Sequence, residues 1–413
     1  MERFYGLIGK KLGHSYSVPI HKYMGNSNYS LFELEKDELA SFLHRDDLGG
    51  INITIPYKID VMPFCDCISE EALKIGSVNT IVQRNGKLFG YNTDKYGFCL
   101  MIKHAGIDMN GKKVLVLGSG GASRTACYCA KELGASKVVV ISRSGENNYG
   151  NLHKHRDAQI IVNTTPVGMY PDNASSPLSL KDFPNCTGVA DVIYNPLRTA
   201  LMAEAESLNI KTAGGLLMLT AQAKQAEELF FDTAIDDSVC LNCASELLRN
   251  SQNIVLIGMP GSGKSAVGNA LALLTGREAI ETDALIEEQS GKSIPEIFRD
   301  NGEAVFRRIE AEVIANAAKQ SGKIIMTGGG AVTTPANYLP LHQNGRIYEV
   351  MRDIDSLATD GRPLSKDIDT LKEMYKTRRP MYDAFRDAFV ENSGTPLDTA
   401  KMIWSDFNEN TCY

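Results

Sequence analysis

Short runs of hydrophobic residues alternate with longer segments of helical spacing along the whole chain. Alternation of this kind is typical of α/β domains built on largely parallel sheets. In the first part of the chain we expect three helices. One ends near Leu133, and the other two cover 202–208 and 215–231. The expected strands are residues 50–56, 113–118, 137–142, 158–163 and 189–193.

The same order begins again after a polar stretch at 236–252. The pattern there predicts strands at 254–257, 323–327 and 346–351. It also predicts a helix that begins at Lys264, helices that continue to Lys319, and a helix that begins near Thr370. We interpret 236–252 as a helix end and short linker between two enzymes. No internal repeat or low-complexity segment is present, so the pattern indicates a fusion and not a duplication.

A glycine-rich turn follows a predicted buried strand in each part of the chain. The second turn, Gly258–Ser265, has the form G-x-x-x-x-G-K-S. Backbone N–H groups of such a loop surround phosphate oxygens, its lysine reaches the β- and γ-phosphates, and its serine hydroxyl binds Mg²⁺. The first turn, Gly118–Ser123, is of the dinucleotide type, with Ser123 where the third glycine usually stands. The two turns predict a dinucleotide enzyme joined to a nucleoside-triphosphate enzyme.

Size, charge and cysteine content narrow the class of protein. A length of 413 residues predicts two or three domains, and a net charge of −7 disfavours general affinity for nucleic acid or anionic membranes. No apolar run approaches the roughly 20 residues of a membrane helix, and the start lacks a signal-peptide pattern. The nine cysteines are scattered, and the C-x-x-C spacing at 240–243 has no second pair for zinc, so inert thiols and a cytoplasmic location are expected.

Polar clusters in the first part resemble shikimate dehydrogenase over about residues 1–245. They lie at 14–17, 52–58, 77–80, 91–94, 163–169 and 218–223, together with the turn at 118–123. The combination is specific, whereas the glycine turn alone would be a weak signal.

The resemblance implies a role for each matching residue. The substrate carboxylate would be held by Ser15 and Ser17, the ring and hydroxyls by Thr54, Asn79, Tyr194 and Gln222, and the catalytic pair would be Lys58 and Asp94. The cofactor would contact Gly118, Gly120, Gly121, Ala122, Ser142, Arg143 and Gly215. A lysine can transfer the proton that accompanies hydride transfer when burial lowers its pKa and a carboxylate orients it. The alternative is that Lys58 and Asp94 form a solvated charge pair.

The end of the second nucleotide-domain strand indicates the cofactor. NAD-binding units place an Asp or Glu there, whereas this strand ends Ile141-Ser142-Arg143-Ser144. An arginine suits a 2′-phosphate, so NADP(H) is expected, although Arg143 could also be an ordinary surface residue. Only residues 144–159 separate this strand from the motif at Asn163, so the nucleotide domain is expected to be shortened.

A second set of motifs resembles shikimate kinase over about residues 252–413. The set comprises 281–283, 306–310, 328–331, 361–364 and 378–382, together with the loop at 258–265. The resemblance implies that Arg307 and Arg378 clamp the substrate carboxylate, that Gly329 and Gly330 contact the substrate, and that Asp283, Lys264 and the lid residue Arg362 are catalytic. ATP would bind Gly258, Gly261, Ser262, Gly263 and Ser265, and Mg²⁺ would lie near Ser265 and Glu281. A solvated helix face is the alternative for Arg307, and an exposed lid residue is the alternative for Arg362.

Two features depart from the kinase pattern. Glu281 stands where the family usually has Asp, and it can still act on Mg²⁺ through water. The lid, 353–362, is short, and Ala358-Thr359-Asp360 occupy the stretch where an arginine would contact adenine.

The expected fold is α/β throughout. Residues 1–96 and 213–246 would form a substrate-binding domain, 97–212 a shortened Rossmann-like NADP domain, and 252–413 a P-loop kinase domain with a parallel sheet. The expected function is NADPH-dependent reduction of 3-dehydroshikimate to shikimate, followed by ATP-dependent phosphorylation at the 3-hydroxyl. The alternatives are a catabolic quinate/shikimate dehydrogenase fused to another small-molecule kinase, and a regulatory protein that binds without turnover. The oligomeric state stays open.

Overall fold

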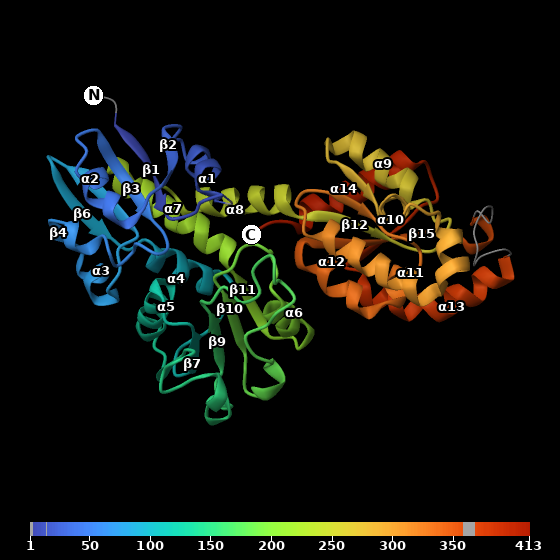
Figure 1. The fold of residues 1–413 in the computed structure, drawn as a ribbon, viewed down its shortest axis with the longest axis horizontal. Helices are drawn as coiled ribbons and strands as arrows, with labels where there is room; N and C mark the ends of the chain where they lie inside the picture. The colour runs from blue at the N-terminus through green and yellow to red at the C-terminus, as the bar shows by residue number, and fades with distance from the viewer. Residues whose placement is uncertain (1–2, 14, 358–367) are drawn as a thin grey trace. The chain divides into compact units, whose positions relative to one another are not determined.

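The computed structural model describes residues 3–13, 15–357 and 368–413, which fall into two compact units (Figure 1). The first unit contains residues 1–195, 199–245 and 413, and the second contains 196–198 and 246–412. Both units consist of helices packed on sheets that are wholly or mainly parallel, so the predicted α/β class is confirmed.

The first lobe of unit 1 is a six-stranded mixed sheet in the order β2-β1-β3-β5-β6-β4. Its strands are β1 (Phe4–Gly9), β2 (Tyr29–Glu33), β3 (Leu48–Ile53), β4 (Cys67–Ile68), β5 (Thr80–Arg84) and β6 (Lys87–Tyr91), and its helices are α1 (Ser17–Tyr23), α2 (Leu39–Leu43) and α3 (Glu70–Ile75). Every residue of β3 is buried. A Cβ at Gly50 would lie 2.2 Å from the ring of Phe230, so this strand can pack closely against the helix that carries Phe230.

The second lobe of unit 1 is a five-stranded parallel sheet in the order β11-β10-β9-β7-β8. Its strands are β7 (Lys113–Leu117), β8 (Lys137–Ile141), β9 (Ile160–Asn163), β10 (Gly188–Asp191) and β11 (Lys211–Gly214), with helices α5 (Gly121–Glu132) and α6 (Ala200–Ser207). The sheet ends at β8, and residues 144–159 form no strand but a 3₁₀ segment at Tyr149–His155. The nucleotide lobe is therefore short on the β8 side.

Two helices carry the chain between these lobes, namely α4 (Asp94–His104) and α7 (Gly215–Phe231) (Figure 1). They lie against each other, and a Cβ at Gly97 would stand 2.4 Å from the carbonyl oxygen of Met218. Because α4 begins at Asp94, this packing fixes the position of a predicted catalytic residue at the boundary of the lobes.

Unit 2 is built on a five-stranded parallel sheet in the order β13-β14-β12-β15-β16. The strands are β12 (Asn253–Ile257), β13 (Ala279–Glu281), β14 (Ile324–Met326), β15 (Gly345–Met351) and β16 (Ala388–Glu391). One hydrophobic core joins the sheet to α9 (Lys264–Thr275) and α14 (Pro396–Asn410), and another joins it to α11 (Ile294–Ala318), α12 (Tyr338–Asn344) and α13 (Ile368–Phe385). The three-residue strand β13, followed by α10 (Thr282–Ser290), is too short to give a sequence pattern.

The polar stretch after Asp236 is one continuous helix, α8 (Asp237–Ser251), so the prediction of a short linker there was wrong. Arg277 donates from Nη1 to the carbonyl oxygen of Gln252 at 2.7 Å and from Nη2 to that of Arg249. Its guanidinium also lies 4.9 Å from the ring centre of Phe407. Carbonyls at the end of a helix need donors, and a half-buried arginine distant in sequence provides them here.

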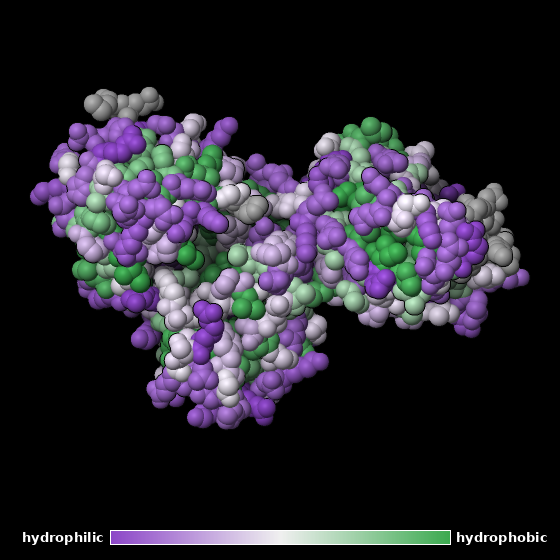
Figure 2. Space-filling model, viewed as in Figure 1, coloured by the Kyte–Doolittle hydropathy of each residue, from purple (hydrophilic) through white to green (hydrophobic). Residues whose placement is uncertain are grey.

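Hydrophilic residues cover most of the face shown in Figure 2, and the surface is hollowed where the two lobes of unit 1 meet. Among the helices of the described residues, none has the length and apolar character that would let it cross a membrane.

Candidate active sites

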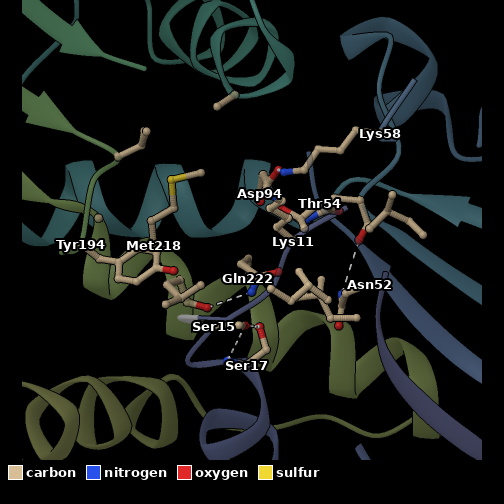
Figure 3. A pocket seen from close by; sticks show the side chains of 18 of the residues that line it. Lys11, Ser15, Ser17, Asn52, Thr54, Lys58, Asp94, Tyr194, Met218 and Gln222 are labelled. Atoms are coloured by element: carbon tan, nitrogen blue, oxygen red, sulfur yellow. Dashed lines mark hydrogen bonds and ion pairs between the residues drawn. The ribbon is translucent and has the colours of Figure 1, made fainter. Parts of the chain in front are cut away.

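The predicted dehydrogenase pair, Lys58 and Asp94, forms an ion pair inside a cavity (Figure 3). Lys58 lies in the turn after β3, Asp94 is the first residue of α4, and Nζ is 2.5 Å from Oδ2. The two side chains are 16% and 10% exposed, so they are not a solvated surface pair. An ammonium group is thus held beside a carboxylate at the wall of a cavity of about 430 Å³.

This substrate cavity gathers residues from both lobes of unit 1. Of the predicted site residues, those that line it are Ser15, Ser17, Thr54, Lys58, Asn79, Asp94, Ala122, Tyr194, Gly215 and Gln222. Figure 3 shows Lys58 and Asp94 side by side at one end and the two serines at another. Lys11, Asn52 and Met218 line it as well, although no role was predicted for them. Asn52 lies in the sequence motif 52–58, so the motif could have identified it as a cavity residue.

Serine hydroxyls occupy the start of α1. Ser15 Oγ donates to Ser17 Oγ at 3.0 Å and accepts from the Ser17 backbone N–H at 3.2 Å. The ring of Tyr16 packs 5.5 Å from that of Tyr194, which lies in the cofactor lobe. Neighbouring hydroxyls of this kind suit a carboxylate, because each can donate one hydrogen bond to it. His14 of the same cluster lies outside the described residues.

The turn between β7 and α5 has the backbone form of a phosphate loop. Gly118 has φ +107°, and a Cβ there would be 2.8 Å from Oγ1 of Thr164. Ser123 Oγ donates to the Gly118 carbonyl at 2.7 Å, so this serine ties the turn to the helix at the place of a third glycine. Around Gly120 no described atom lies within 4 Å of an added Cβ, and Gly121 begins α5. Uncapped N–H groups at a helix start form a site for a pyrophosphate, and the residues present fit one.

Arg143 lies just beyond β8 and is exposed. Burial raises the pKa of the nearby Tyr149, and the Arg143 charge lowers it, so the guanidinium lies close to that ring. The preceding residue, Ser142, donates its backbone N–H to the Asn147 carbonyl at 3.1 Å. A cation is therefore present at the strand end where the 2′-substituent of a dinucleotide is bound in such sheets.

A buried carboxylate terminates β10. Asp191 accepts hydrogen bonds from Asn163 Nδ2 at 3.0 Å, from Thr199 Oγ1 at 2.8 Å and from the Ile193 N–H at 3.1 Å. Burial raises the pKa of Asp191 to about 6, and these three donors oppose the rise. Asp191 thus links the ends of β9 and β10 at the edge of the sheet where the dinucleotide turn lies.

The loop between β12 and α9 has the geometry of a triphosphate loop. Gly258 has φ +147°, and a Cβ there would be 2.5 Å from the Val350 carbonyl oxygen. Lys264 Nζ donates to the carbonyls of Gly258 and Met259 at 2.9 and 3.0 Å. Gly261, Gly263, Lys264 and Ser265 line a cavity of about 630 Å³. Ser262, by contrast, is buried, and its carbonyl accepts a hydrogen bond from Asn392 Nδ2 at 2.8 Å. Asn392 is 130 residues away from Ser262, and local patterning gave no signal for it.

Two oxygen ligands meet at the start of α9, where the hydroxyl of Ser265 donates to the carboxylate of Glu281. Both residues line the same cavity as the phosphate loop. Mg²⁺ binds oxygen and keeps several waters and phosphate oxygens, so few protein ligands are needed and these two fit it. Within the described part of the chain, no group of three or more His, Cys, Asp and Glu residues could hold a metal ion by itself.

An acid–base cluster lies beside the loop. Burial raises the pKa of Asp283, whereas the Lys264 and Arg307 charges lower it. Asp283 Oδ1 and Glu310 Oε1 are buried, and neither has a hydrogen-bond partner among the described residues. Arg307 donates to Glu310 Oε2 at 2.8 Å and pairs with Glu303 at 3.2 Å, with a side chain 15% exposed. The orphaned Asp283 oxygen is an acceptor available to a hydroxyl group in the cavity.

The three glycines after β14 allow this cluster to close around the cavity. A Cβ at Gly328 would be 2.6 Å from Asp283 Oδ1, one at Gly329 would be 2.6 Å from Pro260, and one at Gly330 would be 2.4 Å from Arg307 Nη2. The Gly329 carbonyl accepts from Arg378 Nη1 at 3.0 Å and from Tyr382 at 2.7 Å. Arg307 and Arg378, from different helices, are therefore brought to one wall.

A second cavity of about 740 Å³ lies next to the phosphate-loop cavity in unit 2. It is lined by residues of 349–355, Lys372, Tyr375 and 391–394. Arg352 lines both cavities, and no sequence feature pointed to it. The predicted lid residue Arg362 and the stretch 358–360 lie outside the described residues.

Comparisons with known proteins agree with both sets of motifs. Residues 7–81 match the family model for the shikimate dehydrogenase substrate binding domain, and residues 260–407 match that for shikimate kinase. A shikimate dehydrogenase (NADP(+)) of Clostridium perfringens is 38% identical over 266 residues, which cover 59% of this chain and 98% of that protein.

Solved structures show the same relation. Shikimate dehydrogenase 1 of Peptoclostridium difficile has a TM-score of 0.56 at 38% identity, covering 59% of this chain and 97% of its own. A shikimate 5-dehydrogenase of Thermus thermophilus, solved with NADP(H) and shikimate, has a TM-score of 0.55 at 32% identity, covering 60% of this chain and 99% of its own.

The buried carboxyl of Asp191 predicts a pH-dependent stability. Its pKa of about 6 in the fold exceeds the value of about 3.9 expected for an unfolded chain. The contribution of this carboxyl to the free energy of unfolding is therefore largest while the carboxyl is protonated. It falls by about 3 kcal/mol as the pH rises from about 4 to about 6. In urea unfolding of unit 1, the stability difference between the parent chain and Asp191→Asn should shrink by that amount across this range. A difference that stays constant with pH would contradict the raised pKa.

Proposed function

Because the chain belongs to the shikimate dehydrogenase family and also contains a shikimate kinase domain, we propose that it catalyses two consecutive steps on one substrate. The first reduces 3-dehydroshikimate to shikimate, and the second phosphorylates the shikimate 3-hydroxyl. NADP(H) serves the dehydrogenase, and ATP with Mg²⁺ serves the kinase. The observation that carries the proposal is that Lys58–Asp94 in one unit and Asp283 in the other face cavities lined by each family's motifs.

In the reduction, NADPH supplies the hydride. Lys58 donates a proton to the carbonyl oxygen as it becomes a hydroxyl, and Asp94, 2.5 Å from its ammonium, orients it. Ser15 and Ser17 bind the substrate carboxylate from the start of α1. The ring and its hydroxyls are bound by Thr54, Asn79, Tyr194 and Gln222.

The cofactor binds at the carboxyl ends of the parallel strands of the second lobe. The residues assigned to it are Gly118, Gly120, Gly121 and Ala122 of the turn, Ser142 and Arg143 after β8, and Gly215 at the start of α7. Ala122 and Gly215 also line the substrate cavity, so cofactor and substrate meet there. The exposed guanidinium of Arg143 selects the 2′-phosphate.

In the phosphorylation, Asp283 accepts the proton of the reacting hydroxyl through its unpartnered oxygen. Arg307 and Arg378 clamp the substrate carboxylate, and the N–H groups of Gly329 and Gly330 contact the substrate. Gly258, Gly261, Ser262 and Gly263 surround the phosphates, and Lys264 turns from its loop carbonyls to reach them. Ser265 and Glu281 would hold Mg²⁺, which would neutralise phosphate charge, and Arg362, outside the described residues, would be a further catalytic arginine.

We assign residues 1–96 and 213–246 to substrate binding, 97–212 to NADP binding and 252–413 to the kinase. All nine cysteines are free thiols, and both members of the 240–243 pair are buried, which supports a reducing, cytoplasmic location. The negative net charge and the cavities favour small-molecule substrates over nucleic acid or membrane partners.

The test is one reaction with the purified chain, 3-dehydroshikimate, NADPH, ATP and Mg²⁺, with products identified by mass. We expect shikimate 3-phosphate, and shikimate alone when ATP is omitted. Preference for NAD together with turnover of quinate would favour the catabolic alternative. Measurable shikimate binding with no product from either unit would favour the regulatory one.

Lys58→Ala and Asp94→Ala should each lower the dehydrogenase kcat by about 10²–10⁴-fold, because a positioned acid is lost. The kinase activity of the same chain should not change and so reports correct folding of unit 2. Lys36→Ala is the matched control, since Lys36 is an exposed lysine paired with Asp60 at 2.6 Å. Reduction at the parent rate by Lys58→Ala would contradict the assignment.

Arg143→Ala should raise the KM for NADPH by at least about tenfold while the KM for NADH changes little, because one charge-assisted contact to the 2′-phosphate is lost. Steady-state kinetics with both cofactors measure this. Arg156→Ala, at an exposed arginine paired with Asp182 in the same lobe, is the control. Equal changes for the two cofactors would show that Arg143 does not read the phosphate.

Asp283→Asn should abolish phosphoryl transfer and leave ATP binding intact, because the loop at 258–265 is untouched. Lys264→Ala should instead weaken ATP use directly. Product formation and nucleotide titration separate the two effects, and Asp300→Asn, at an exposed aspartate paired with Arg299, is the control. Turnover retained by Asp283→Asn would remove Asp283 from the role of base.

A further inference from the structure

A layer of buried hydroxyl groups lies behind the substrate cavity of unit 1. Tyr29, Thr80 and Thr93 are at most 4% exposed, and none of them lines the cavity. Each forms a hydrogen bond to a residue that does line it. The sequence gave no role to any of the three, and the proposed chemistry does not use them.

The hydrogen bonds form a continuous network. Tyr29 Oη donates to Asn52 Oδ1 at 2.7 Å, and Asn52 Nδ2 donates to Thr80 Oγ1 at 3.0 Å. Thr80 Oγ1 lies 3.1 Å from Thr93 Oγ1, which accepts from Asn79 Nδ2 at 3.0 Å.

The network ends at Gln222. Thr93 Oγ1 donates to Gln222 Oε1 at 3.3 Å. Three cavity-lining amides, those of Asn52, Asn79 and Gln222, are thus joined through groups that the substrate does not touch.

Tyr29 occupies the outer end of this network and acts on the cavity through Asn52. Burial, and after it the nearby charge of Glu227, raises the pKa of the tyrosine well above its usual value. Because its pKa is raised, the hydroxyl keeps its proton and remains a donor to Asn52. With Oδ1 of Asn52 taken by Tyr29 and Nδ2 by Thr80, the amide is fixed in one orientation.

The ring of Tyr29 is itself held by a buried histidine that is hydrogen-bonded to a glutamate. The imidazole of His21 stacks on it with ring centres 3.7 Å apart and an interplanar angle of 8°. His21 Nδ1 contacts Glu227 Oε1, which also accepts from Asn26 Nδ2 at 3.0 Å. His21 and Glu227 are 0% and 1% exposed. Helix α7, which supplies Gln222 to the cavity, thus also supplies the carboxylate that fixes His21.

We propose that Tyr29 is a positioning residue of the dehydrogenase site, which orients Asn52 for substrate and is held in register by the His21–Glu227 pair. The inference rests on the proposed dehydrogenase function. Lys58 and Asp94 are bonded to each other and share no hydrogen bond with Tyr29, so the effect falls on substrate binding and not on proton transfer.

Tyr29→Phe removes the hydroxyl and keeps the ring on His21. It leaves Asn52 Oδ1 buried without its donor, so we expect the KM for 3-dehydroshikimate to rise about tenfold. The kcat should stay within about twofold, as should the KM for NADPH. NADPH oxidation is the readout, because the kinase unit also binds shikimate and would obscure a direct titration.

A double-mutant comparison of KM values tests whether His21 acts through Tyr29. His21→Asn keeps a donor for Glu227 and removes the stacked ring, and it should raise the same KM about fivefold in the parent chain. In the Tyr29→Phe chain it should raise that KM no further, because residues that act through one contact are not additive. Fully additive effects would overturn the role given to the His21–Glu227 pair.

Tyr57→Phe is the matched control for losing a buried tyrosine hydroxyl. Tyr57 is 2% exposed and lies in the same lobe, and its hydroxyl donates to the Leu34 carbonyl at 2.6 Å, away from the network. Its KM for 3-dehydroshikimate should stay at the parent value. A kcat for 3-dehydroshikimate reduction near the parent value verifies that unit 1 is folded in each variant, whereas kinase activity reports only on unit 2.

Thr80→Val gives a second route if Tyr29→Phe does not fold, since it removes the hydroxyl on the other side of Asn52 and should also raise KM with kcat retained. An unchanged KM in folded Tyr29→Phe, or in Thr80→Val in its place, would overturn the inference while leaving the dehydrogenase assignment intact. A fall in kcat with KM unchanged would also overturn it. Absence of 3-dehydroshikimate reduction by the parent chain would instead refute the proposed function.

Discussion

Close approach of chain segments at the carboxyl ends of parallel strands is the constraint on which both active sites depend. A Cβ at Gly118 would meet Thr164, one at Gly258 would meet the Val350 carbonyl, and one at Gly330 would meet Arg307, all within 2.8 Å. Parallel strands bring their carboxyl ends to one edge, and turns without side chains leave backbone N–H groups open to phosphate there. The absence of side chains at these glycines also leaves room for Arg307 and Asp283 at the cavity wall in unit 2.

Charges inside these cavities are useful because they are partly withdrawn from water. Lys58 and Asp94 pair at 2.5 Å with little exposure, and Asp283 lies buried beside Lys264 and Arg307. Burial raises the pKa of Asp283, and the charges of Lys264 and Arg307 oppose part of that rise. Both units thus place a weakly exposed ionisable group beside a partner of opposite charge at a cavity wall.

Substrate positioning in unit 1 depends on groups outside the cavity. The network from Tyr29 through Asn52 and Thr80 to Gln222 crosses β2, β3, β5 and α7. Helix α7 supplies Gln222 to the cavity and Glu227 to His21, and α4 packs against it at Gly97. Because α4 begins at Asp94 and α7 carries Gln222, the packing of these two helices sets the relative positions of a carboxylate and an amide at the cavity wall.

The sequence by itself determined the α/β class, eight of the sixteen strands in the described residues and the glycine turns, because alternation and turn chemistry are local properties. Its motifs also identified Lys58, Asp94 and Asp283 as candidate catalytic residues, although their roles remain predictions. Only the tertiary structure decided that 237–251 is a continuous helix, that Arg277 donates to the carbonyls near its end, and that Asn392, Arg352 and Tyr29 adjoin the sites. These contacts join residues up to 130 positions apart, and such pairings arise from strand order and helix packing, which no local pattern encodes.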